Sequence, residues 1–257
     1  MRTFLFPCVI TTATLFLASH VFAQVNIEKF RKTDLDRGES GFVEFDLSSR
    51  SGNVDITELS VDCRSDFVRE TTDSFIVLRG DYGWAKGETF SDEALLHTRH
   101  IRRLDKRVRT ELFAQIDYNK KRLLDFRGLA GAGIRMSVYR QKRFTSWWGT
   151  AAMYEREELD IAPADRHDET SNAVRWSNYL TTNVAFDDRI GWSSTTYVQP
   201  DFGDFADVRI LCDTNLNVDL NRRLSLVVSF RLRYDSDPPE TIEKTDTRLG
   251  TGLALRY

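Results

Sequence analysis

The stretch RRLSLVVSFRLRYDSDPPETIEKTDTRLGTGLALRY, residues 222–257, decides the fold of this chain. In its first part apolar side chains occupy every second position, and Val227 is the one apolar residue among the serines and arginines between them. This period of two predicts a strand with one apolar and one polar face. After the turn-forming Asp235–Pro239 segment the alternation returns and continues to the end. Taken alone, this hairpin fits a membrane barrel and a soluble antiparallel sheet equally well.

The last residue, Tyr257, is an aromatic side chain on the apolar parity. A final strand of this kind resembles the closing strand of bacterial outer-membrane barrels. The resemblance implies that Tyr257 is an assembly signal, with the barrel assembly machinery as a partner of the C-terminal strand.

The N-terminus has the pattern of a secretory signal peptide. Arg2 gives a positive start, residues 3–18 are largely apolar, and Val21-Phe22-Ala23 precedes a cleavage site. Pro7 and a threonine-rich run interrupt the segment, which is also short for a transmembrane helix. We therefore expect residues 1–23 to be removed after Ala23 and the mature chain to be exported, with 24–40 as a periplasmic lead-in and 41–257 as the barrel.

Composition narrows the class of protein. No stretch of the mature chain approaches the roughly 20 apolar residues of a membrane helix. A charged fraction of 29% and a mean hydropathy of -0.41 suit a barrel, in which every second residue faces the interior. The net charge of -3 argues against binding to nucleic acid. No cofactor is implied, and Cys63 and Cys212 lack the spacing of a metal site.

The alternation continues through the mature chain and predicts an all-β, antiparallel transmembrane barrel of about 12 strands. The segment 89–104 is the least regular, because histidine and arginine share a parity with Leu95 and Ile101; we expect Ala94, Leu96 and Thr98 on its outer face. Connections predicted to be outside alternate with shorter inside ones. Residues 65–73 are the exception, being longer than an inside turn should be.

Several motifs resemble one family. They are GFVEFDLSSRSGN, the YERE after Met153, SNYL, YVQP and, most specifically, RYDSDPPETIEKTDTRLGTGL. Together they resemble bacterial outer-membrane proteins described as salt-induced, a domain of unknown function. The resemblance implies an outer-membrane barrel in contact with outer-membrane lipid, and it supplies no catalytic residues.

Three function classes remain open. The first is a non-enzymatic, porin-like barrel, structural or with a narrow pore for small solutes or ions. Its interior would be lined by charges of both signs, which favours ion pairs across the interior. The residues expected there are Arg79, Asp81, Arg109, Glu111, Asp117, Arg135, Glu155, Arg175, Asp207, Arg209, Asp213, Asp219, Arg231, Arg233, Arg248 and Arg256.

The second class is an outer-membrane enzyme that modifies lipid. It requires a nucleophile and a base, and His167, beside Asp165 in an outer loop, is the candidate base; no lipid-facing serine stands near it in sequence. The third class is a soluble periplasmic binding module built on a β-sheet. It would scatter aromatic residues through a core, whereas here they cluster toward strand ends.

The two mature cysteines are expected to be free. Cys63 falls on the second strand and Cys212 on the tenth, which are four steps of about 4.8 Å apart round a twelve-stranded ring. A disulfide allows only about 4.4–6.8 Å between α-carbons. Both side chains should also point outward.

Overall fold

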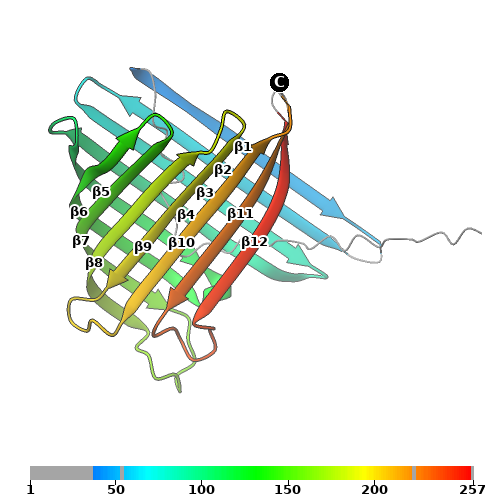
Figure 1. Ribbon diagram of the computed structural model, residues 1–257. Helices are drawn as coiled ribbons and strands as arrows, with labels where there is room; N and C mark the ends of the chain where they lie inside the picture. The colour runs from blue at the N-terminus through cyan, green and yellow to red at the C-terminus, as the bar shows by residue number, and fades with distance from the viewer. Residues whose placement is uncertain (1–36, 53–54, 222–223, 256–257) are drawn as a thin grey trace, which may run out of the picture.

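The structure is a computed structural model that describes residues 37–52, 55–221 and 224–255, with side chains described up to residue 252. It contains one twelve-stranded sheet in which each strand pairs antiparallel with its neighbours in sequence (Figure 1). The predicted all-β, antiparallel fold is confirmed. The strands are β1 Gly38–Arg50, β2 Ile56–Val68, β3 Thr72–Ala85, β4 Glu88–Arg103, β5 Val108–Asn119, β6 Leu124–Gln141, β7 Phe144–Leu159, β8 Thr170–Ala185, β9 Ile190–Pro200, β10 Val208–Asp219, β11 Leu224–Asp235 and β12 Thr245–Leu255.

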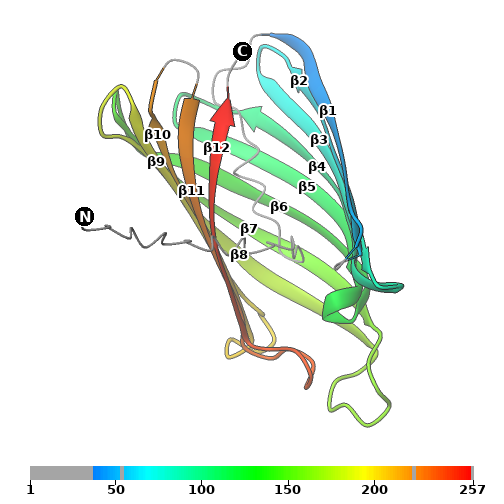
Figure 2. The ribbon, with the colours of Figure 1, turned by 90° about the vertical axis from the view of Figure 1, so that its right-hand side faces the viewer.

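The sheet curves around an interior, so that β1 and β12 face each other across it (Figure 2). These two strands are the edges of the sheet, and no ladder joins them within the described ranges. Strand β1 begins at Gly38, inside the segment expected as lead-in. None of the described residues forms a helix long and apolar enough to cross a membrane.

The longest connections gather at one end of the sheet. The three longest, residues 160–169, 201–207 and 236–244, share the end opposite to the start of β1 and the finish of β12 (Figure 1). The expected long connection at 65–73 is wrong. Strand β2 continues to Val68, and the turn is only residues 69–71, closed by the Arg69 N–H donating to the Thr72 carbonyl at 2.8 Å.

One of the two-residue turns shows why the chain reverses where it does. Strands β3 and β4 are joined by Lys86 and Gly87, both with positive φ (52° and 86°). Two-residue hairpin loops with positive φ at both positions match the right-handed twist of the strands they join. Gly87 takes this conformation without strain, since it has no Cβ.

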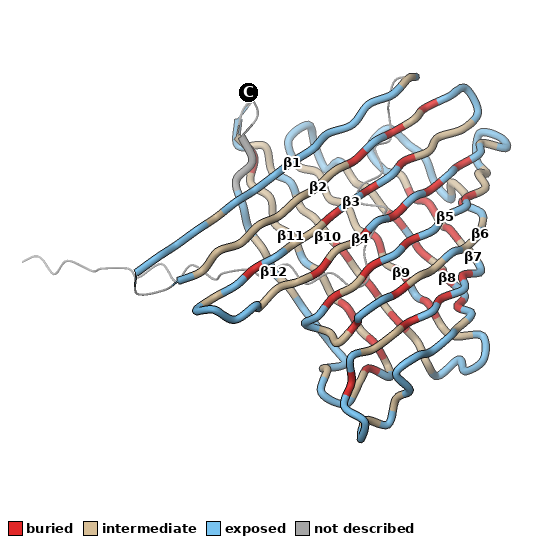
Figure 3. The backbone as a smooth tube through the Cα atoms, turned by 180° about the vertical axis from the view of Figure 1, so that it is seen from behind, coloured by how far each residue is buried: buried red, intermediate tan, exposed pale blue. Residues whose placement is uncertain are grey.

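The distribution of side chains is inverted relative to a water-soluble protein. Among the described residues, 25 polar or charged residues are buried against 12 hydrophobic ones, while 28 large hydrophobic residues are exposed. Buried and exposed positions alternate along the strands (Figure 3). Charged groups therefore occupy the inner face of the sheet, and its outer face is apolar.

Strand β4 follows the same alternation despite its irregular sequence. Leu95, His97 and Arg99 are buried, whereas Leu96 and Thr98 are exposed. The predicted outer face of this strand is confirmed. The sequence of β4 does not by itself show which face is inner, because apolar and charged residues mix on the inner face. There His97 and Arg99 lie opposite Val77 and Phe75 of β3.

Outward aromatic residues gather toward both ends of the sheet. Toward the long-loop end, the rings of Tyr82 and Trp84 are 5.4 Å apart, and Trp176 stacks on Phe202 at 6.4 Å. At the opposite end, Tyr139 contacts Phe144 edge-on at 5.2 Å. Aromatic residues are favoured where apolar and aqueous surroundings meet, because several of them combine an apolar ring with a polar tip. Their positions indicate such a boundary toward each end of the sheet.

Both cysteines are free, as predicted. Cys63 pairs with Val43 on β1, and Cys212 with Thr196 on β9, whose hydroxyl donates to the Cys212 sulfur at 3.3 Å. Each cysteine lies on the outer face of its strand, Cys63 on β2 and Cys212 on β10.

Candidate functional site

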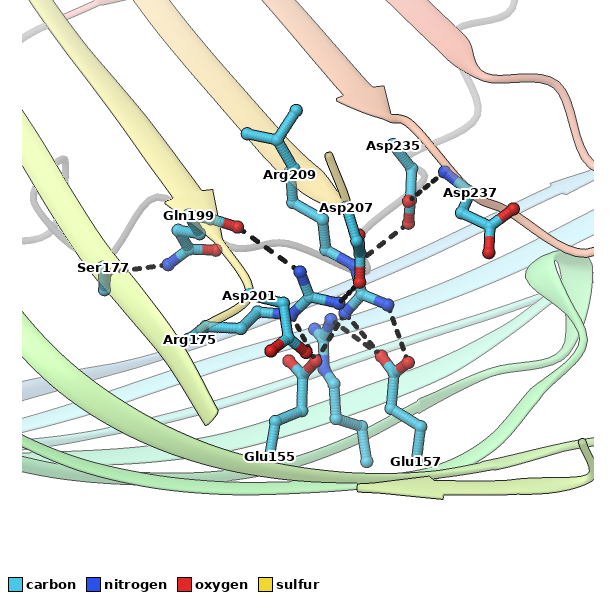
Figure 4. A network of polar contacts seen from close by, with 12 residues as sticks. Glu155, Glu157, Arg175, Ser177, Gln199, Asp201, Asp207, Arg209, Asp235 and Asp237 are labelled. Carbon is cyan, nitrogen blue, oxygen red and sulfur yellow. Dashed lines mark hydrogen bonds and ion pairs between the residues drawn. The ribbon is translucent and has the colours of Figure 1, made fainter. Parts of the chain in front are cut away.

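The most elaborate feature of the inner face is a cluster of buried arginines and carboxylates, which we call the interior network. It joins β5, β6, β7, β8, β10 and β11 near the long-loop end (Figure 4). Its members are Asp117, Arg127, Glu155, Glu157, Arg175, Asp207, Arg209 and Asp235.

Arg209 is the centre of this network. Its Nη1 is 2.7 Å from Glu155 Oε1, and its two terminal nitrogens lie 2.8 and 2.7 Å from the two oxygens of Glu157. Its Nε lies 3.1 Å from Asp235 Oδ2. Paired forks of this kind are the strongest arrangement of guanidinium and carboxylate. Arg209 belongs to β10 and its glutamates to β7, so these contacts cross the interior over two intervening strands.

Two further arginines complete the network. Arg175 donates from Nε to Glu155 at 3.0 Å and from Nη2 to Asp207 at 2.8 Å. Arg127 donates to Asp117 at 2.8 Å and lies 3.7 Å from Glu157. Removing charges from water is costly unless each is paired, and here each arginine contacts at least two carboxylates.

The local sequence explains how β7 supplies two carboxylates at once. In the run Met153-Tyr154-Glu155-Arg156-Glu157, the pleat sends Glu155 and Glu157 inward, while Tyr154 and Arg156 are exposed. Outside, Arg156 pairs with Glu158 at 2.8 Å in an exposed contact.

A second contact across the interior joins β8 to β5, apart from the interior network. The Tyr179 hydroxyl on β8 donates to Glu111 on β5 at 3.0 Å, and Glu111 also accepts from Arg99 at 3.2 Å. Gly149 makes this possible, because a Cβ there would lie 2.1 Å from the Tyr179 ring. The ring can therefore lie over β7 and reach β5.

The remaining interior contains open space. A cavity of about 550 Å³ is bounded by β1–β3 and β10–β12, and its lining includes Asp62, Arg79, Asp213 and Arg231. Arg79 donates to Asp62 at 2.5 Å and Arg231 to Asp213 at 2.7 Å. The interior is thus hollow beside the two edge strands, and on the β4–β10 side long side chains meet across it.

The sequence-predicted interior charges are found in three settings. Asp117, Glu155, Arg175, Asp207 and Arg209 meet in the interior network. Others line the 550 Å³ cavity or make contacts elsewhere on the inner face: Arg79, Asp81, Asp213, Arg231 and Arg248 in the cavity, Arg109 and Arg135 over the Trp147 ring, Glu111 with Arg99 and Tyr179, Asp219 with Ser225, and Arg233 near the network. Arg256 and Tyr257 lie outside the described residues.

The residues expected in the interior did not include several charges that are buried there. Arg127 and Glu157 belong to the network, and Arg64 pairs with Asp66 on β2. Asp235 was expected in a turn, but it is the last residue of β11 and faces Arg209. All four strands show the period of two, so extending the alternation to the strand ends would have found these residues.

The long loops are held together by a second set of contacts, partly exposed to solvent, which we call the loop clasp. His167 Nδ1 is 2.9 Å from Asp165, and its Nε2 is 3.3 Å from Asp237 in the neighbouring loop. Arg166 also reaches Asp237, at 2.7 Å, and the Glu240 N–H donates to Asp165 at 3.2 Å. Partial burial lowers the pKa of His167, but the hydrogen bond to Asp165 and the charge of Asp237 outweigh it and raise the pKa.

Among the residues that the structure describes, no three histidine, cysteine or acidic side chains are grouped so as to hold a metal ion. The ring of His167, the candidate base of the enzyme hypothesis, is placed between two carboxylates.

The first prediction concerns the interior network. Glu157→Gln should lower the free energy of unfolding in detergent micelles by up to about 3–5 kcal/mol, because it leaves buried arginine charge uncompensated. Glu158→Gln, one residue along and facing outward, should cost less than about 1 kcal/mol. Urea titrations of both variants measure the difference. Equal losses would contradict a structural role for the network.

The second prediction concerns the loop clasp. Because folding raises the pKa of His167, its stabilising charge is present below the unfolded pKa and is lost as pH rises through the folded pKa. Spin labels at residues 164 and 241 should show a broader distance distribution at about pH 9 than at about pH 5. His167→Gln should remove this dependence, while Arg166 keeps part of the contact at both values. A distribution that narrows as pH rises would contradict the assignment.

The chain is similar to one family of proteins and to a solved structure. No curated protein gave a match to the chain. A solved structure described as "NanC porin structure in rhombohedral crystal form" has 10% identity and a TM-score of 0.44, and the similarity covers 85% of this chain and 98% of that one. A likeness of this size is no basis for a conclusion. One family model, described as "Protein of unknown function, DUF481", matches residues 43–257. The chain therefore belongs to the DUF481 family.

Proposed function

We propose that the chain is an exported, non-enzymatic outer-membrane β-barrel, structural or with a narrow pore, whose interior is held by ion pairs. The observation that carries this proposal is the inverted distribution of side chains, with charges buried on the inner face and large apolar residues exposed on the outer face. Lipid is the surrounding in which that distribution is favourable.

The energetic reason is simple. Leaving apolar surface in water costs about 25 cal/mol per Å², and the outer face carries residues such as Leu112, Ile116, Leu180 and Leu249, each about half exposed or more. In a bilayer that cost disappears. A membrane also requires every backbone polar group to be paired, which an antiparallel sheet meets everywhere except at its edges. We therefore infer that β1 and β12 pair when the sheet lies in lipid.

The orientation follows from the connections. Outer-membrane barrels have short periplasmic turns and longer outer loops. The three longest connections would then face outward and the two chain ends the periplasm. The aromatic pairs toward both ends of the sheet fit the two lipid–water interfaces.

The interior network supports a narrow path over a wide pore. Arg209, Glu155 and Glu157 fill part of the lumen, and the larger open space, about 550 Å³, lies in the cavity beside β1 and β12. That cavity contains both signs of charge, so it does not form the single-sign field of a strongly selective channel. The alternative of a lipid-modifying enzyme is less favoured, since both nitrogens of His167 face carboxylates.

The third prediction tests this proposal. The protein should be recovered in the outer-membrane fraction, require detergent for extraction, and migrate differently on a gel before and after heating. In planar bilayers it should conduct weakly, and Arg209→Ala should raise the conductance. Arg156→Ala, an exposed arginine on β7, is the matched control and should leave conductance unchanged.

Two results would contradict the proposal. Recovery in a detergent-free soluble fraction would rule out the membrane barrel. A large, steady conductance of the unmodified protein that Arg209→Ala leaves unchanged would rule out the narrow path.

A further inference from the structure

A second cavity lies at the long-loop end of the sheet, above the interior network. Its volume is about 320 Å³, enough for a small organic molecule. Its lining combines strand ends with the loops of residues 160–169, 201–207 and 236–244, and with Arg122 in the short 3-10 turn Lys120–Arg122 between β5 and β6. The loop clasp joins the first and third of these loops. The network residues Arg127, Glu157 and Arg209 also line the cavity.

Some charged side chains that line this cavity form ion pairs and others do not. It is lined by six arginines and six carboxylates. Four of the carboxylates pair with an arginine: Glu157, Asp207, Asp235 and Asp237. Of the other two, Asp201 accepts from the Gly203 N–H at 2.6 Å and Asp168 is exposed to solvent.

Two arginines of the lining have no such partner. Arg233 is 8% exposed, and its Nε and Nη1 are buried without a hydrogen bond; Arg122 Nε is in the same state. No ion pair joins either side chain to another described residue. Asp235 and Asp246 lie near Arg233, the first bonded to Arg209 and the second opposite on β12. A buried guanidinium with unused donors is costly, and the cost is removed when an anion pairs with it.

We propose that this cavity binds a small oxyanion, a carboxylate or a phosphate group, through Arg233 and Arg122. The planar guanidinium presents donors in a fork that matches both groups. Four of the six carboxylates in the lining are already engaged with other arginines, whereas donors of Arg233 and Arg122 are buried and unused. The side chains involved belong to the sheet and its loops, so the proposal does not depend on membrane location or on conductance.

The decisive variant is Arg233→Gln, which removes the charge and leaves a shorter, neutral polar side chain. Arg156→Gln, on the outer face of β7, is the matched control. Calorimetric titration in detergent micelles, with inorganic phosphate and acetate as probes and chloride at equal ionic strength as reference, measures binding. The unmodified protein and Arg156→Gln should bind saturably, and Arg233→Gln should bind about tenfold more weakly or not at all. Arg122→Gln should also weaken binding.

The unfolding temperature separates binding from a structural role. Phosphate should raise it in the unmodified protein and not in Arg233→Gln. Without phosphate, Arg233→Gln should unfold at the same temperature or higher, because an uncompensated buried charge has been removed. No saturable binding, or equal binding in Arg233→Gln, would overturn the proposal, as would a lower unfolding temperature of that variant without phosphate.

A further comparison identifies the source of the anion. In nanodiscs of phosphatidylglycerol, phosphate should bind as it does in nanodiscs of phosphatidylcholine if the ligand is a free solute. Weaker binding in phosphatidylglycerol would assign the same site to a lipid headgroup. Both results support an oxyanion site.

Discussion

The pairing of buried charges is the constraint on which the rest of the structure depends. A sheet whose outer face is apolar must send its charges inward, and inside they are removed from bulk water. Each buried carboxylate or guanidinium is then costly unless a partner lies within reach. The contacts of Arg209 with Glu155, Glu157 and Asp235 meet this requirement and connect β7, β10 and β11. The same contacts favour the curvature that brings non-adjacent strands together.

This constraint explains the uneven interior. On the β4–β10 side, long side chains meet across the lumen, and Gly149 leaves room for Tyr179 to reach Glu111. Beside β1 and β12, Arg79 pairs with Asp62 and Arg231 with Asp213, each on an adjacent strand. A cavity of about 550 Å³ remains there. Any path through the barrel would therefore follow the two edge strands, and the packed side would serve as the rigid wall.

Much of the fold could be predicted from the sequence, because the period of two is a local property. It identified the twelve strands, and even the ambiguous β4 has the predicted outer residues Leu96 and Thr98. Strand ends were less well predicted: β2 continues to Val68, and Asp235 belongs to β11. The partners of each charge could not be predicted. The contact between Arg209 and Glu157 depends on how far the sheet curves, and the unpaired state of Arg233 depends on the positions of all the carboxylates around it.

The most direct test of the account is to measure whether each face of one strand is exposed to lipid or to water. Single spin labels along residues 111–117 of β5, in a chain whose Cys63 and Cys212 are replaced by alanine, would report this by relaxation in reconstituted membranes. The account predicts that labels at Leu112, Ala114 and Ile116 collide with lipid-soluble oxygen and are protected from a water-soluble nickel reagent. Labels at the residues between them should not show high oxygen exposure. Strong nickel exposure at Leu112, Ala114 and Ile116 would show that the apolar face meets water and would contradict the account.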